Sequence, residues 1–365
     1  MPSPATDPDN PGALIGTAAA RRNAVASPRV RRFRRILLGL GAVGLLVPVI
    51  AGLISAATSP PHIKGVPLGH LIYLSPDEPS EHTTFLRGLR IADSAGHSRE
   101  IIHEFEAQDA DTGEREWFGQ PKASPNGRYI AYERQVFTIL DEKQTTENQI
   151  DVIDLSMSDP KPRLLIDLSA EKLKQVVGLA WTVDGAYVAF LEDTQIRYVP
   201  VAPNARPRPA DPLPLLLDQP KVSSEISAAR SLALAPGASA YLEVTARGQW
   251  LCASRGEQSL EFRNVRAYAL ASDGSQLAYV PGGSGHALVV AQWNGSTRTV
   301  PVRWGWSLFG RREITAVSWS PDGRFLAYSV SKPPIEDELF CVRLSDGEVF
   351  QLPVRAGRAA WDWGR

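Results

Sequence analysis

The chain has 365 residues, a formal net charge of −1 and two cysteines, Cys252 and Cys341. Two cysteines exclude a disulfide-stabilised scaffold. The near-neutral total conceals an uneven distribution, because residues 1–35 carry seven arginines and two aspartates, whereas residues 36–365 carry 32 basic and 38 acidic residues. We therefore expect a basic N-terminal tail, a mildly acidic main part and no nucleic-acid partner.

The N-terminal part predicts a membrane anchor. Residues 1–35, rich in Pro, Ala and Arg, are expected to be a disordered tail. Residues 36–57 contain no charged side chain in 22 positions, which is enough for a transmembrane helix in the lipid bilayer. The preceding arginines place the tail in the cytoplasm and everything after a linker at 58–66 outside. The alternative is a secreted protein, released by signal-peptide cleavage near Ala57.

A nine-residue motif recurs along the main part at spacings of a few tens of residues, which indicates a repeat architecture. Its centre is Asp-Gly or Asn-Gly. After two further residues come an apolar residue, Ala and an aromatic residue. This order is typical of a tight turn that leads into a β-strand. A fifth, decayed copy begins at Ala235. The four well-preserved copies are Ser124–Tyr132, Thr182–Phe190, Ala271–Tyr279 and Ser320–Tyr328.

Four short strands for each copy predict one blade of a β-propeller. Residues 69–106 supply only three strands, and the C-terminal segment 359–364 resembles the strand that precedes each turn. We therefore predict an all-β, six-bladed β-propeller over residues 67–365, with a first blade that the C-terminal strand closes. The two cysteines fall in equivalent strands of blades four and six, where a disulfide between them is not expected. The other five blades are predicted at about 116–168, 176–218, 226–263, 264–303 and 313–354.

The motif Ser-Pro-Asp-Gly-Arg-x-Leu-Ala-Tyr at Ser320–Tyr328 resembles the WD40-like (PD40) repeat of TolB-like six-bladed propellers. The resemblance covers roughly residues 67–365. It implies the propeller fold, but the family includes translocation-complex subunits, peptidase propeller domains and proteins without a known role. TolB itself carries an α/β domain before its propeller, for which this chain is expected to have no room.

Aromatic residues in two connections between blades form the candidate ligand-binding site. In propellers such connections gather on one face, and exposed aromatic and arginine side chains suit stacking on sugars or anchoring a peptide. The alternative is that they fill the wedges between blades, as we expect of the repeated Trp181, Trp319 and Trp361. The candidates are Trp117, Phe118, Trp304, Trp306, Phe309, Arg311 and Arg312.

No cofactor, metal or catalytic group is expected. The six histidines lie apart, without metal-ligand spacing. The acidic run from Glu104 to Glu116 is expected to be a solvated connection, and the alternative is a cation site around Asp109 and Asp111.

The sequence thus favours a non-enzymatic, membrane-anchored extracytoplasmic propeller that acts as a binding or scaffold module for a protein, peptide or glycan. One alternative is a transmembrane sensor that signals through residues 1–35. Another is a glycosidase-like propeller hydrolase, which needs paired carboxylates at a defined separation.

Overall fold

The computed structural model divides into two units, Met1–Thr58 and Ser59–Arg365. All described residues belong to the second unit, and the predicted tail, transmembrane helix and linker lie outside them. Within the described residues, no helix has the length and apolar character needed to cross a membrane. The described residues are 69–76, 86–93, 97–102, 115–140, 143–170, 176–192, 195–202, 211–212, 228–245, 248–283, 286–302, 312–332, 336–357 and 361–364.

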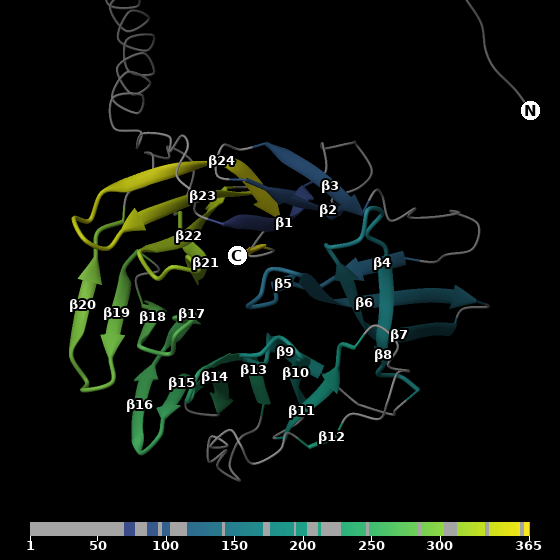
Figure 1. Ribbon diagram of the computed structural model, residues 1–365. Coiled ribbons are helices and arrows are strands. Elements are labelled where there is room, and N and C mark those ends of the chain that lie inside the picture. Colours follow the sequence, from purple (N-terminus) through teal and green to yellow (C-terminus); the bar gives the residue numbers. More distant parts are fainter. Residues whose placement is uncertain are drawn as a thin grey trace, which may run out of the picture. The chain divides into compact units, whose positions relative to one another are not determined.

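These residues form six antiparallel sheets in a ring, which is an all-β, six-bladed propeller, as predicted (Figure 1). From the axis of the ring outwards, the first blade consists of β25 (Trp361–Gly364), β1 (His70–Pro76), β2 (Leu86–Ala92) and β3 (Ser98–Ile102). In the second blade β4 and β5 share the inner position, and its strands are β4 (Arg115–Phe118), β5 (Lys122–Ala123), β6 (Tyr129–Leu140), β7 (Lys143–Asp154) and β8 (Pro162–Asp167).

The other four blades follow the chain, each with its earliest strand innermost. The third comprises β9 (Val176–Trp181), β10 (Tyr187–Glu192), β11 (Gln195–Pro200) and β12 (Asp211–Pro212). The fourth comprises β13 (Ala228–Ala235), β14 (Ala238–Thr245), β15 (Gly248–Arg255) and β16 (Gln258–Arg263). The fifth comprises β17 (Val265–Leu270), β18 (Gln276–Pro281), β19 (Leu288–Gln292) and β20 (Thr297–Val300). The sixth comprises β21 (Ile314–Trp319), β22 (Phe325–Lys332), β23 (Glu336–Arg343) and β24 (Val349–Gly357).

The C-terminal strand closes the ring, which confirms that prediction. β25 pairs antiparallel with β1, in a register that sets Gly364 opposite His70. The carboxylate of Asp362 accepts hydrogen bonds from the backbone N–H of Ala123 at 3.0 Å and from the hydroxyl of Ser318 at 3.1 Å. Because these two donors belong to the second and the sixth blade, one carboxylate in the first blade connects both of its neighbours.

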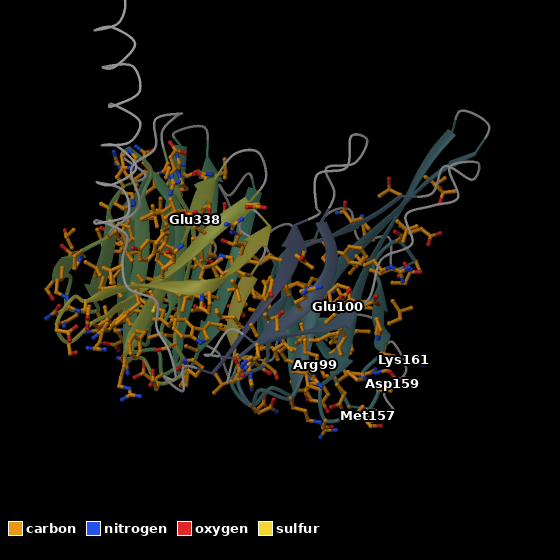
Figure 2. All side chains as sticks on the ribbon, turned by 90° about the horizontal axis from the view of Figure 1, so that it is seen from above. Arg99, Glu100, Met157, Asp159, Lys161 and Glu338 are labelled. Carbon is orange, nitrogen blue, oxygen red and sulfur yellow. The ribbon has the colours of Figure 1, made fainter. Side chains whose placement is uncertain are left out.

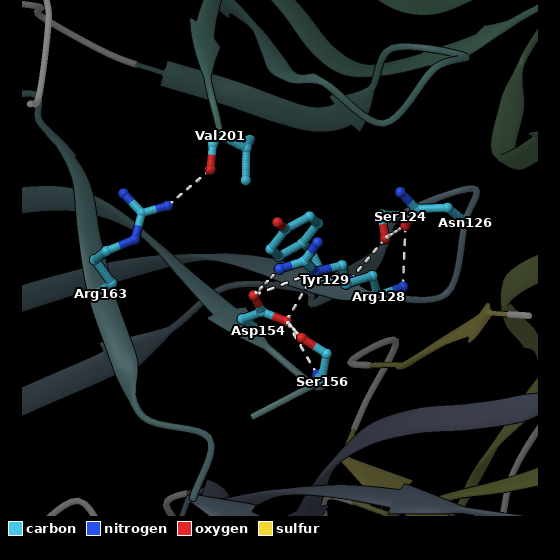
Figure 3. Close-up of polar contacts among 8 residues, drawn as sticks. All are labelled: Ser124, Asn126, Arg128, Tyr129, Asp154, Ser156, Arg163 and Val201. Carbon is cyan, nitrogen blue, oxygen red and sulfur yellow. Dashed lines mark hydrogen bonds and ion pairs between the residues drawn. The ribbon is translucent and has the colours of Figure 1, made fainter. Parts of the chain in front are cut away.

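The recurring motif forms a hydrogen-bonded turn between the first two strands of a blade. In the second blade the hydroxyl of Ser124 donates to Asn126 at 2.7 Å and accepts from the backbone N–H of Tyr129 at 2.8 Å (Figure 3). The N–H of Gly127 closes the turn on the Ser124 carbonyl at 2.9 Å. This glycine has a φ of +70°, which a residue with a Cβ rarely adopts, so the motif requires glycine there.

The repeated tryptophans connect neighbouring blades. Trp181, Trp319 and Trp361 are 5%, 5% and 1% exposed. The indole N–H of Trp181 donates to the carbonyl of Lys122 in the preceding blade at 2.9 Å, and that of Trp319 donates to the carbonyl of Ala269 at 3.0 Å. Their predicted place in the core is confirmed.

Candidate functional site

The propeller presents two different faces. On one, which we call the turn face, the turns of the motif contact each other around the ring. The Ser272 hydroxyl donates to the carbonyl of Pro321 at 3.1 Å. A Cβ on Gly185 would lie 3.1 Å from Asn126, and one on Gly69 would lie 3.3 Å from Pro321. On the other, which we call the connection face, the last strand of a blade leads to the first strand of the next.

Four of the predicted ligand-binding residues, Trp304, Trp306, Phe309 and Arg311, lie outside the described residues. For Trp117 the structure describes only the backbone, which pairs with Gln135 in β6. Phe118 is 5% exposed and packs on Tyr132, with ring centroids 5.9 Å apart. Its ring packs in the hydrophobic cluster between the first and second blades, with Ile72 and Leu89 of the first. We therefore remove Phe118 from the candidate site.

Arg312 is held by a carboxylate that the sequence analysis did not identify. Its guanidinium donates to Glu338 in β23 at 2.8 Å, and both side chains are only 17% exposed. A charge-assisted pair with little solvent around it is stronger than an exposed one. Arg312 therefore fixes the point at which the connection from the fifth blade enters β21, and its charge is already compensated within the protein.

Arg312 and Glu338 belong to a larger group of polar side chains, which we call the rim cluster. Glu313 forms an ion pair with Arg266 of β17, and its backbone N–H donates to the Ser331 hydroxyl at 3.1 Å. The cluster thus joins the fifth blade to the sixth. Figure 2 shows Glu338 toward one side of the ring, away from Met157 and Lys161 on the other. The members of the rim cluster are Arg266, Arg312, Glu313, Ser331 and Glu338.

A buried hydrogen-bonded group lies in the same blade. The Thr315 hydroxyl is 2.5 Å from a carboxylate oxygen of Asp337 and 2.7 Å from the Ser329 hydroxyl. Asp337 and Ser329 are fully buried. Such partners are required, because burying a hydroxyl without a hydrogen bond costs roughly 2–7 kcal/mol and burying an unpaired carboxylate costs more. These hydrogen bonds connect β21, β22 and β23 of the sixth blade.

The turn face carries a cavity of about 430 Å³ between the first and second blades. Its polar lining includes His70, Asp93, His97, Arg99 and Asn126. His97 contacts Asp93 twice, through its ring Nδ1 at 3.1 Å and its backbone N–H at 2.9 Å. Sequence reasoning missed this cavity, because its lining comes from five separate segments of the chain without any shared motif.

The cysteine thiols are not suited to nucleophilic chemistry. Both are free, as predicted, in the third strands of blades four and six. Burial raises the pKa of Cys252 to about 11 and that of Cys341 to about 12, so both stay protonated at neutral pH. In the described part of the chain, no three His, Cys, Asp or Glu side chains come together in a way that could hold a metal ion. The predicted acidic connection around Asp109 and Asp111 lies outside that part.

Comparisons with known proteins show that this chain resembles solved structures in its fold. The chain matches no protein-family model and no curated protein sequence. TolB from Acinetobacter baumannii is similar in structure, with a TM-score of 0.54, 16% identity, and coverage of 83% of this chain and 68% of that one. A puromycin hydrolase gives a TM-score of 0.48 and 13% identity, with coverage of 84% of this chain and 55% of that one. The chain therefore has a TolB-like propeller fold.

Proposed function

We propose that this chain is a non-enzymatic, membrane-anchored binding module, whose propeller recognises an extracytoplasmic protein, peptide or glycan through the connection face. A TolB-like propeller supports a binding or scaffold role in general. The observation that carries the proposal is the rim cluster. In this cluster the ion pair of Arg312 and Glu338 fixes the end of one connection between blades. The sequence of that connection contains Trp304, Trp306, Phe309 and Arg311. A recognition loop needs such a rigid support.

Site-specific photo-crosslinking in the membranes of the cell tests this proposal. The full chain receives a photoreactive residue either at Trp306, in the sequence between β20 and β21, or at Met157 on the turn face, which is 59% exposed. We expect a discrete adduct from position 306, and a much weaker one from position 157. Equal adducts from both positions would contradict the choice of face.

The aromatic residues are tested separately. The full chain in detergent is applied to a glycan array and to immobilised extracytoplasmic proteins of the same cell. We expect the double variant Trp304→Ala and Trp306→Ala to lower the binding about tenfold or more, because aromatic anchors dominate such sites. The control Met157→Ala should bind as the parent does. Unchanged binding by the double variant would exclude this loop as the site.

A further inference from the structure

The β6–β7 hairpin has an open edge. β6 and β7 pair over all twelve residues, from Tyr129 opposite Asp154 to Leu140 opposite Lys143, without a register shift. β8 pairs with β7 only from Gln149 to Ile153. Figure 1 shows the hairpin extending outward past β8. In the part of the chain that the structure describes, no strand therefore pairs with residues 143–147 on the side away from β6.

The direction of the backbone groups along this edge follows from Asn148. Its N–H donates to the Ser169 hydroxyl at 2.9 Å, and its carbonyl accepts from Leu168 at 2.8 Å, both on the side away from β6. Backbone groups alternate in direction along a strand, and no bulge interrupts the pairing with β6. Gln144 and Thr146 therefore direct their N–H and carbonyl groups outward, and Thr145 directs its own toward β6.

The open edge is complementary to itself. It begins at Lys143, the first residue of β7, and ends at Glu147, because the groups of Asn148 are already paired. Two such edges that pair antiparallel over all five residues have one possible register, centred on Thr145. In this register Gln144 of each copy faces Thr146 of the other, which allows four hydrogen bonds between the copies. The same register sets Lys143 opposite Glu147 twice, and opposite charges in facing positions stabilise a pair of strands.

We propose that a second copy of this chain binds this edge at residues 143–147, antiparallel and symmetric about Thr145. The sheets of the two second blades then form one continuous sheet through paired β7 strands, in a two-fold arrangement. The length of the open edge and the register positions of Lys143 and Glu147 in β7 support this partner independently of each other. Five residues from each copy form a small interface, so the dimer depends on a high local concentration, such as chains in one membrane have.

Disulfide crosslinking of the full chain in its membrane tests the register. Residues that face each other without hydrogen bonds between them have Cα atoms about 4.5 Å apart, which is within the range for a disulfide. Thr145→Cys should therefore give an intermolecular disulfide under mild oxidation. Thr146→Cys is the matched control, since it lies on the other face of the strand opposite Gln144. The parent chain, with Cys252 and Cys341 alone, gives the background.

Two further sets of variants, made in the Thr145→Cys chain, test the charges and the backbone. Lys143→Glu or Glu147→Lys alone should lower the crosslinked fraction about fivefold, and the two together should restore it. Thr146→Pro removes an outward N–H and leaves the pairing with β6 intact, so it should lower crosslinking by about fivefold or more, whereas Thr146→Ala should not.

The proposal is overturned if Thr146→Cys crosslinks as well as Thr145→Cys, if single charge reversals have no effect, or if a different protein is crosslinked at Thr145. Circular dichroism checks that the variants fold. If Thr146→Pro does not fold, the charge reversals and their combination decide the matter, since they leave the backbone unchanged.

Discussion

The turn face and the connection face of this propeller are built by different rules. On the turn face the same contacts recur: a Ser or Thr hydroxyl donates to the Asn or Asp two residues on, as at Ser124, Thr182 and Ser320. On the connection face the contacts are specific to one place, as in the pair of Arg312 and Glu338. Repetition therefore specifies the scaffold, and the residues that distinguish this propeller from another lie between the repeats.

Both faces depend on ring closure, so the largest expected effect comes from its central side chain. Trp361 in β25 is 1% exposed. Trp361→Ala should lower the free energy of unfolding by about 3–5 kcal/mol, because it removes a large buried ring and leaves a cavity. Urea unfolding followed by circular dichroism measures the loss. The exposed Met157→Ala is the control, and a Trp361→Ala variant as stable as that control would show that the C-terminal strand does not hold the ring closed.

The turn face is tested by removing one hydroxyl. Ser320 is fully buried, and its hydroxyl accepts from the N–H of Phe325 at 2.9 Å and donates to Asp322 at 2.6 Å. Ser320→Ala should cost about 1–3 kcal/mol of unfolding free energy, because a buried N–H loses its acceptor. Ser296→Ala, at an exposed turn with similar side-chain contacts, should cost about 0.5 kcal/mol or less. Equal losses would mean that the repeated hydroxyl does not stabilise the turn face.

The connection face is tested by a double-mutant cycle. Arg312→Ala and Glu338→Ala should show a coupling free energy of about 1 kcal/mol, because the pair is largely shielded from solvent. Arg355 and Glu336 form the comparison, since their side chains are 60% and 25% exposed at 3.3 Å. That pair should show a smaller coupling, about 0.3 kcal/mol. A reversed order would contradict the role of the rim cluster as a rigid support.

The same contrast explains how much of the molecule the sequence predicts. The Asp-Gly turns, the small alanines and the tryptophans act locally or repeat, so the six blades and the closing strand could be found from their pattern. The strand that Trp361 begins was recognised because it resembles the segment that ends in Trp319. These residues are constrained by the blade itself, which leaves a signal at a fixed spacing.

The candidate site was less predictable, because its contacts join distant segments once only. Arg312 was identified as a candidate, but its partner Glu338 is 26 residues away in another strand. Phe118 is aromatic, as many ligand-binding residues are, and only the folded structure reveals that its side chain is buried. The cavity beside Arg99 and Asn126 is likewise formed by strands that meet only in the folded ring. Neither a motif nor a period marks such contacts.

The smallest expected effect is a loss of stability on the turn face at low pH. The guanidinium of Arg128 donates to both carboxylate oxygens of Asp154, at 2.7, 3.1 and 3.2 Å (Figure 3). This contact, followed by the hydrogen bonds from Ser156, lowers the pKa of Asp154 to about 2. An unfolded aspartate has a pKa of about 3.9. The stabilisation is therefore complete above about pH 4 and is lost as the pH falls toward 2. Since the pair is exposed, we expect less than about 1 kcal/mol.

The difference in unfolding midpoint between the parent and Asp154→Asn, measured in urea at pH 6, 4 and 2, should shrink as the pH falls. In an Arg128→Ala chain the same substitution should show less of this pH dependence, because the largest cause of the lowered pKa is gone and only the hydrogen bonds from Ser156 remain. The pKa of Asp184 is lowered by the hydroxyl of Thr182, in the motif turn of the third blade. Its contribution to the free energy of unfolding is therefore also lost as the pH falls. If the Asp154 difference is constant with pH, the Arg128 contact does not form in solution, and the turn face is held by its hydroxyl and backbone hydrogen bonds alone.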